Sequence, residues 1–137
     1  MELNSYQKQV IRDLSEYLGC VNRSPNLYAA WREYWFSKDV AVGSGGVPSY
    51  NNSIETVPHI CMKVPTGGGK TFLACASVRR ITDAMPSSRP KVVVWLVPSD
   101  SILTQTIKNL SNVNHPYRHV WIRTLPGAWA FTQKKCC

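Results

Sequence analysis

The sequence predicts an α/β fold in which parallel strands alternate with flanking helices. Two short apolar runs, at residues 59–64 and 91–97, are each followed by a helical pattern, at residues 71–82 and 100–110. Residues 92–97 are apolar without a break, which is typical of a strand buried on both faces of a parallel sheet. A strand, a helix and a second strand in this order favour a βαβ unit with a right-handed crossover.

Two further helices are expected ahead of these elements. Residues 3–18 carry apolar side chains at three- and four-residue spacing, so they are predicted to form a helix with one buried face, which Gly19 ends. A second helix is expected to begin with Ser24 as its N-cap and Pro25 at its first position. Residues 40–58 are rich in turn-forming residues and are predicted to be a loop. The apolar positions expected to face the core are Val10, Ile11, Leu14, Tyr17, Leu18, Leu27, Ala30, Trp31, Tyr34 and Trp35.

Composition places the chain among globular proteins of one domain. Of its 137 residues, 44% are hydrophobic and 18% are charged. The formal charge of +8 favours a polyanionic partner, and nucleic acid before a membrane because no basic amphipathic helix stands out. We expect no secretory leader and no membrane span. The five cysteines are scattered and show no metal-binding spacing, which indicates reduced thiols and a cytoplasmic protein.

Residues 65–71, here called the phosphate loop, read Pro-Thr-Gly-Gly-Gly-Lys-Thr. They match the end of the pattern G-x-x-x-x-G-K-[ST], although Val64 stands where the first glycine is usual. Consecutive glycines allow positive φ angles and close approach of the backbone to a polyphosphate, and the following helix presents its N–H groups. Lys70 adds about 4 kcal/mol of attraction at an effective dielectric of about 20, and the hydroxyl of Thr71 suits Mg²⁺. The predicted nucleotide site is Thr66, Gly67, Gly68, Gly69, Lys70 and Thr71.

The phosphate loop resembles motif I of superfamily 2 helicases, most closely those related to the Res subunit of type III restriction enzymes. In that group Pro-Thr-Gly often replaces the glycine-first form. The resemblance implies a partial RecA-like P-loop domain over residues 1–118, with ATP and Mg²⁺ as cofactors and Thr71 as the metal ligand. It also implies DNA, or RNA, as a partner, and a modification subunit if the chain is restriction-related.

A second part of the resemblance lies at residues 3–7, which are similar to the Tyr-Gln segment that precedes motif I in these motors. The resemblance gives Gln7 the role of hydrogen-bonding the adenine base. An amide offers both the donor and the acceptor that the edge of adenine requires. Gln9 is the second candidate for this role.

A third part lies at residues 97–105, which resemble motif Ia and imply contacts with the nucleic-acid backbone through Pro98, Ser99 and Gln105. The hydroxyl of Ser99 and the helix N-terminus behind it are able to donate hydrogen bonds to a phosphate. The alternative is that Ser99 is an ordinary capping residue at the end of a strand.

No complete catalytic set is present in the sequence. The eight acidic residues are isolated from one another, so the chain contains no Asp-Glu pair. The resemblance implies that a motor of this kind needs such a pair, to hold Mg²⁺ and activate water, and a second RecA-like domain with arginine fingers. We therefore expect ATP binding without efficient hydrolysis, and ATP hydrolase and helicase as activities of the family rather than of this chain alone.

Residues 119–137 are predicted to be an irregular tail, because they show neither helical nor strand periodicity. A shifted reading frame would produce such a tail, and a genuine short tail is the alternative. Three interpretations of function follow: an N-terminal fragment of a DNA-dependent ATPase or helicase, a free-standing nucleotide-binding module that does not hydrolyse ATP, or an inert remnant of a disrupted gene. A P-loop kinase is a fourth, for which the sequence shows neither acceptor-binding residues nor a lid.

Overall fold

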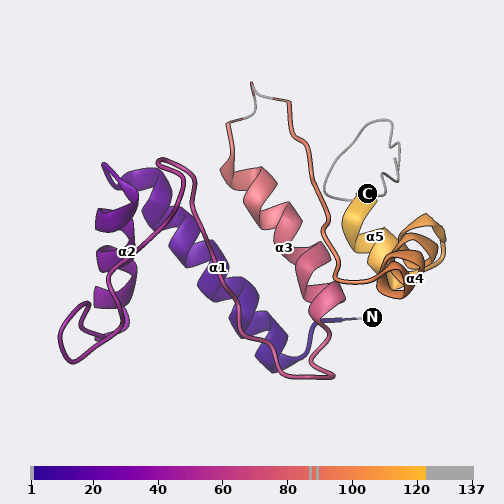
Figure 1. Cartoon of the computed structure of the whole chain (residues 1–137), viewed down its shortest axis with the longest axis horizontal. Helices are drawn as coiled ribbons and strands as arrows, with labels where there is room; N and C mark the ends of the chain where they lie inside the picture. Colours follow the sequence, from indigo (N-terminus) through magenta and orange to yellow (C-terminus); the bar gives the residue numbers. More distant parts are fainter. Residues whose placement is uncertain (1, 87, 89, 123–137) are drawn as a thin grey trace.

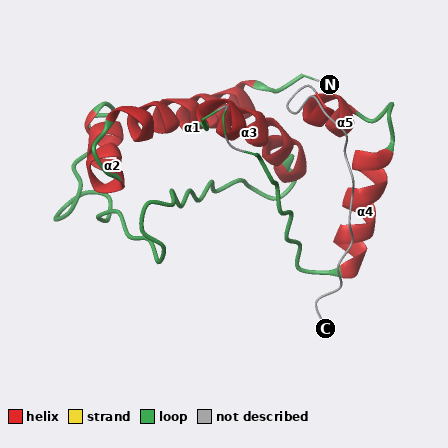
Figure 2. Cartoon of the chain, turned by 90° about the horizontal axis from the view of Figure 1, so that it is seen from above, coloured by secondary structure: helices red, strands yellow, loops and turns green. Residues whose placement is uncertain are grey.

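The structure of the chain is a computed structural model that describes residues 2–86, 88 and 90–122. These residues form five helices, which lie in a bent row (Figures 1 and 2). The long helices α1 and α3 lie side by side, α2 packs on α1, and α4 and α5 lie on the far side of α3 (Figure 1). The helices are α1 (Ser5–Arg23), α2 (Leu27–Phe36), α3 (Lys70–Ala84), α4 (Asp100–Ser111) and α5 (Pro116–Ile122).

The first helix begins at a capping box and runs further than predicted. The side chain of Asn4 accepts a hydrogen bond from the Gln7 N–H, and the Gln7 side chain accepts one from the Asn4 N–H. The prediction that Gly19 ends α1 is wrong, because the helix continues through it to Arg23. A glycine inside a helix costs about 1 kcal/mol relative to alanine, and burial of Cys20 in the following turn offsets that cost.

The second helix begins later than predicted and is held to α1 by both aromatic and charged contacts. Its N-cap is Asn26 rather than Ser24, because the Asn26 side chain accepts from the Ala29 N–H. Tyr17 of α1 packs edge-to-face against Trp31 and Tyr34 of α2, as the apolar spacing of both helices predicts. The exposed Arg23 and the half-buried Lys38 form ion pairs with Glu33, Asp13 and Glu16. Such surface pairs contribute little stability, so the aromatic contacts carry most of this interface.

Much of the core lies along α3, which packs against α1 on one side and α5 on the other. Its buried residues include Leu73 and Cys75, the most completely buried large side chains of the structure. Cys75 also joins Leu110 of α4 in a cluster to which Tyr117 of α5 adds a partly buried ring. The helices predicted at residues 71–82 and 100–110 are confirmed, as is the loop at residues 40–58.

The predicted α/β fold, a partial RecA-like domain of parallel strands with flanking helices, is wrong for the described residues, which contain no strand. Residues 59–64 and 91–97 run alongside the helices as non-helical segments, and no β-ladder joins them. The single β-bridge within the described residues links Val42 and Val47 inside a loop. A strand needs a hydrogen-bonded neighbour along its length. An apolar run favours an extended backbone, but it does not supply that neighbour.

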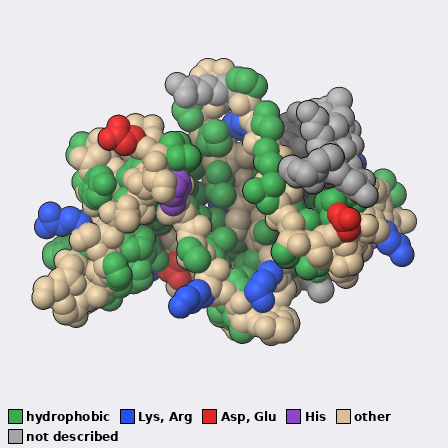
Figure 3. All heavy atoms as spheres, viewed as in Figure 1, with side chains coloured by type: hydrophobic (Ala, Val, Ile, Leu, Met, Phe, Trp, Pro, Cys, Tyr) green, Lys and Arg blue, Asp and Glu red, His purple; other side chains and the backbone are tan. Residues whose placement is uncertain are grey.

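Residues 91–97 also differ from the prediction that both faces of this segment are buried. Burial alternates along the segment: Val93 and Trp95 pack against the Cys75–Leu110 cluster, while the three aliphatic side chains before, between and after them point outward. Val92, Val94 and Leu96 are 85%, 75% and 87% exposed. Figure 3 shows hydrophobic side chains gathered on this face beside α3. One face of the segment therefore belongs to the core, and the other is open.

Candidate nucleotide-binding site

The phosphate loop closes a tight turn in front of α3. The Gly68 N–H donates to the Pro65 carbonyl at 3.0 Å. Gly67 and Gly69 have φ angles of 78° and 76°, in the left-handed region that favours glycine. A Cβ at Gly69 would lie 2.6 Å from Nε2 of Gln7, whereas a Cβ at Gly67 would have no atom within 4 Å. Backbone conformation therefore favours glycine at both positions, and a side chain at Gly69 would also have to displace the amide of Gln7.

The helix behind the loop begins without a side-chain cap. The N-cap of α3 is Gly69, whereas the side chains of Asn4, Asn26 and Ser99 cap α1, α2 and α4. The Leu73 N–H donates to the Gly69 carbonyl at 2.9 Å, which closes the first helical turn. The N–H groups ahead of Leu73 have no partner within the helix. Together with the positive end of the helix dipole, they suit an anion.

Three polar side chains accompany these backbone donors. Nζ of Lys70 donates to the Pro65 carbonyl at 3.0 Å, so the ammonium group lies over the loop. Thr66 and Lys70 are exposed, and Thr71 is half-buried in the first turn of α3. A phosphate oxygen is a charged acceptor and would form a stronger bond with Lys70 than the neutral carbonyl does.

The predicted adenine contact, Gln7, lies against the phosphate loop. Its side chain is buried, with Nε2 donating to the Gly68 carbonyl at 3.1 Å and Oε1 accepting from the Asn4 N–H at 3.1 Å. The second candidate, Gln9, is exposed and donates to Asp13 at 3.1 Å. The structure thus brings Gln7 and the glycines together, although they are far apart in the sequence.

Tyr6 is a further residue of the site that sequence reasoning missed. Its hydroxyl donates to the carbonyl of Lys63 at 3.2 Å, just ahead of the phosphate loop. The signal that could have found it is its place beside Gln7, since neighbouring residues in the first turn of α1 are able to reach the same segment.

A family model described as type III restriction enzyme, res subunit, matches residues 1–130. The chain belongs to this family. The match includes the phosphate loop and all five helices, and it confirms the resemblance found in the sequence. It also extends past Arg118, where the sequence predicts that the domain ends, and residues 123–137 of the predicted tail lie outside the described residues. Nothing matches among the curated proteins or among the solved structures.

Membership of the Res family relates the chain to ATP-dependent, helicase-like proteins of restriction systems, which usually bind ATP and Mg²⁺. The residues present fit the polyphosphate of a nucleotide, because uncapped N–H groups, positive-φ glycines and Lys70 converge on one loop. Within the described residues there is no group of three or more His, Cys, Asp and Glu side chains that could hold a metal ion.

The nucleic-acid residues predicted for this Res-family chain lie directly before α4 and within it. Pro98, Ser99 and Gln105 are all exposed. The Ser99 hydroxyl accepts a hydrogen bond from the Ile102 N–H at 3.4 Å, so it acts as the N-cap of α4. The carboxylate of Asp100 lies in the same turn and opposes an anion there. Of the two polar side chains, Ser99 already caps α4, whereas Gln105 has no capping role that would compete with a contact to nucleic acid.

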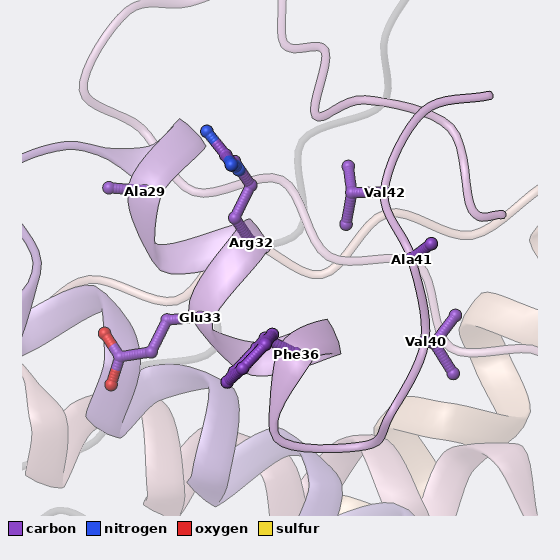
Figure 4. A pocket seen from close by; sticks show the side chains of 7 residues that line it. All are labelled: Ala29, Arg32, Glu33, Phe36, Val40, Ala41 and Val42. Atoms are coloured by element: carbon purple, nitrogen blue, oxygen red, sulfur yellow. The ribbon is translucent and has the colours of Figure 1, made fainter.

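Two hollows lie elsewhere on the surface. One, of about 410 Å³, lies between α2 and residues 40–42; the side chains of Arg32, Glu33 and Phe36 line its α2 side (Figure 4). The other, of about 820 Å³, lies among the aromatic side chains of α1 and α2 and residues 59–63. Neither is lined by the phosphate loop. The candidate nucleotide site lies instead at the loop in front of α3. None of the described helices is both long and apolar enough to cross a membrane.

Proposed function

We propose that the chain binds ATP with Mg²⁺ at the phosphate loop and supplies the nucleotide-binding part of a DNA-dependent motor of the Res family. The observation that supports this most directly is the uncapped start of α3 directly behind the glycine turn, with Lys70 over the loop. Binding needs converging N–H donors and a positive charge, and both are present. Efficient hydrolysis also needs acidic residues that hold the metal and orient water, and the sequence contains no Asp-Glu pair.

The test is the dissociation constant for ATP with Mg²⁺, measured by titration calorimetry for the wild type and for Lys70→Ala. Hydrogen bonds to charged groups contribute about 1.5–3 kcal/mol, so Lys70→Ala should weaken binding by about 10- to 150-fold. The matched control is Arg32→Ala, which removes the same charge from exposed α2 on the far side of α1 (Figure 1). Equal affinities for Lys70→Ala and Arg32→Ala would contradict the proposal, as would a wild type that binds no nucleotide.

The same proposal includes DNA as the partner, supported by family membership and by the formal charge of +8. A basic surface binds DNA with release of counterions, so the affinity should fall steeply as salt rises. Fluorescence anisotropy with a labelled duplex at a series of salt concentrations measures the slope. An affinity that does not change with salt would count against a basic DNA-binding surface. DNA-stimulated ATP turnover by this chain alone would contradict the expectation that it does not hydrolyse ATP efficiently.

A further inference from the structure

Two neighbouring side chains from the first turn of α1 hold the phosphate loop at two points, one just ahead of it and one in its middle. The Tyr6 hydroxyl donates to the carbonyl of Lys63, just ahead of the loop, at 3.2 Å. The Gln7 amide donates to the carbonyl of Gly68, inside the loop, at 3.1 Å. The two contacts span 57 and 61 positions of the sequence. They therefore attach the loop to α1, a helix that is distant from it along the chain.

The amide of Gln7 is itself fixed in orientation. Its Oε1 accepts from the Asn4 N–H at 3.1 Å, and its own N–H donates to the Asn4 side chain at 2.8 Å. Only an amide oxygen accepts from an N–H and only an amide nitrogen donates to a carbonyl, so this network assigns the two ends of the amide. The side chain is 8% exposed. One donor and one acceptor of Gln7 are thus already used inside the protein.

The contact with Gly68 determines how the next peptide group lies. In a trans peptide the carbonyl and the following N–H point in opposite directions, so a Gly68 carbonyl held toward Gln7 turns the Gly69 N–H away from α1. Without this bond the peptide is free to rotate and to present its carbonyl oxygen to an anion, which repels phosphate. The 2.6 Å approach that a Cβ at Gly69 would make to Nε2 shows how closely Gln7 packs on this backbone.

We infer that Tyr6 and Gln7 are positioning residues of the phosphate loop, and that Gln7 acts on the phosphates of a nucleotide through the loop rather than by contacting the base. This inference rests on the proposed ATP binding. A positioning role and an adenine contact predict different effects on ligand affinity. A residue that contacts adenine affects ATP alone, whereas a residue that shapes the loop affects every ligand that carries a polyphosphate.

The experiment compares the dissociation constants of ATP, GTP and inorganic tripolyphosphate, each with Mg²⁺, for the wild type, Gln7→Met and Tyr6→Phe. Gln7→Met keeps the size of the side chain and removes its hydrogen bonds, and Tyr6→Phe removes only the hydroxyl. Each variant should weaken all three ligands by a similar factor, about three- to tenfold. Hydrogen exchange of the backbone amides in residues 66–69 should also become faster in Gln7→Met, without any ligand.

Asn4→Ala serves as the control for the stability of α1. It removes the side-chain oxygen that accepts from the Gln7 N–H and so weakens the N-terminus of α1, but it leaves the bond from the Gln7 amide to the Gly68 carbonyl in place. It should lower the thermal midpoint and leave the affinity for tripolyphosphate unchanged. Loss of affinity for ATP alone, or unchanged affinity for all three ligands in Gln7→Met, would overturn the positioning role. A wild type that binds none of the three would overturn the proposed function itself.

Discussion

Gly67 and Gly69 differ in why a larger residue is unfavourable at each position. Both have positive φ angles, so an alanine at either position should cost about 1–2 kcal/mol of stability. Only Gly69→Ala also forces the amide of Gln7 to move. We predict that Gly69→Ala lowers the free energy of unfolding more than Gly67→Ala does, as measured by urea denaturation. In a Gln7→Ala background the two glycine substitutions should become alike; a difference that persists there would show that Gln7 is not its cause.

Cys75 gives the core a pH dependence of its own. Burial raises the pKa of its thiol from 9.0 to about 12. An unfolded thiol ionises near pH 8.5, so above that pH the native state binds more protons than the unfolded state and stability falls as pH rises. The loss should be about 1.4 kcal/mol per pH unit up to about pH 12. Urea unfolding from pH 8 to pH 10.5 should show a steeper decline for the wild type than for Cys75→Ala, and parallel curves would contradict the buried-thiol explanation.

Among the elements, the helices could be predicted from the sequence, whereas the two predicted strands do not form in the described residues. The apolar stripes of α1 and α3 and the Ser99 cap of α4 are local signals, and each appears in the structure. The ends of α1 and α2 were misplaced because tertiary burial of Cys20 overrides the helix-ending tendency of Gly19 and because Asn26 is the residue that caps α2. A strand depends on a partner elsewhere in the chain, which no local pattern of residues reveals.

In the candidate site, too, features set by consecutive residues could be predicted, and contacts between distant residues could not. The glycine turn and Lys70 could be predicted because their chemistry lies in consecutive residues. The orientation of the Gln7 amide and the contact made by Tyr6 depend on α1 meeting residues 63–68, so they required the structure. The sequence pointed to Gln7 through a family resemblance, whereas its hydrogen bonds give it a structural task that the resemblance does not describe.

In α4 the N-cap, Ser99, and the predicted nucleic-acid contact, Gln105, are different residues, so the two roles can be tested separately. Ser99→Ala removes the N-cap of α4 and should lower the free energy of unfolding by about 1 kcal/mol. Gln105→Ala lies on the exposed face and should leave the thermal midpoint unchanged while weakening binding of a labelled DNA duplex. Thermal melts and anisotropy titrations of both variants distinguish the two roles. If Gln105→Ala binds DNA as the wild type does, the predicted contact at this residue is wrong.

At the scale of the whole molecule, α3 connects two packed regions. It contacts α1 on one side and α5 on the other, and Cys75 lies in the cluster that includes Leu110 of α4. A substitution that disturbs the middle of α3 therefore acts on both regions at once. The phosphate loop leads directly into this helix, so the site adjoins the helix that carries the buried side chains of Leu73 and Cys75.

The open face of residues 91–97 gives the molecule a surface that favours association, because exposed aliphatic side chains in an unpaired extended segment are prone to aggregate. We predict that Val94→Lys, at a position that is 75% exposed, raises the solubility limit and lowers binding of a hydrophobic dye without changing the thermal midpoint. The neighbouring Val93 packs against the Cys75–Leu110 cluster. Val93→Lys should therefore destabilise the fold by about 2–4 kcal/mol, because it places a charge against the core. Equal effects of the two substitutions on the thermal midpoint would mean that the two faces of the segment do not differ as the structure describes.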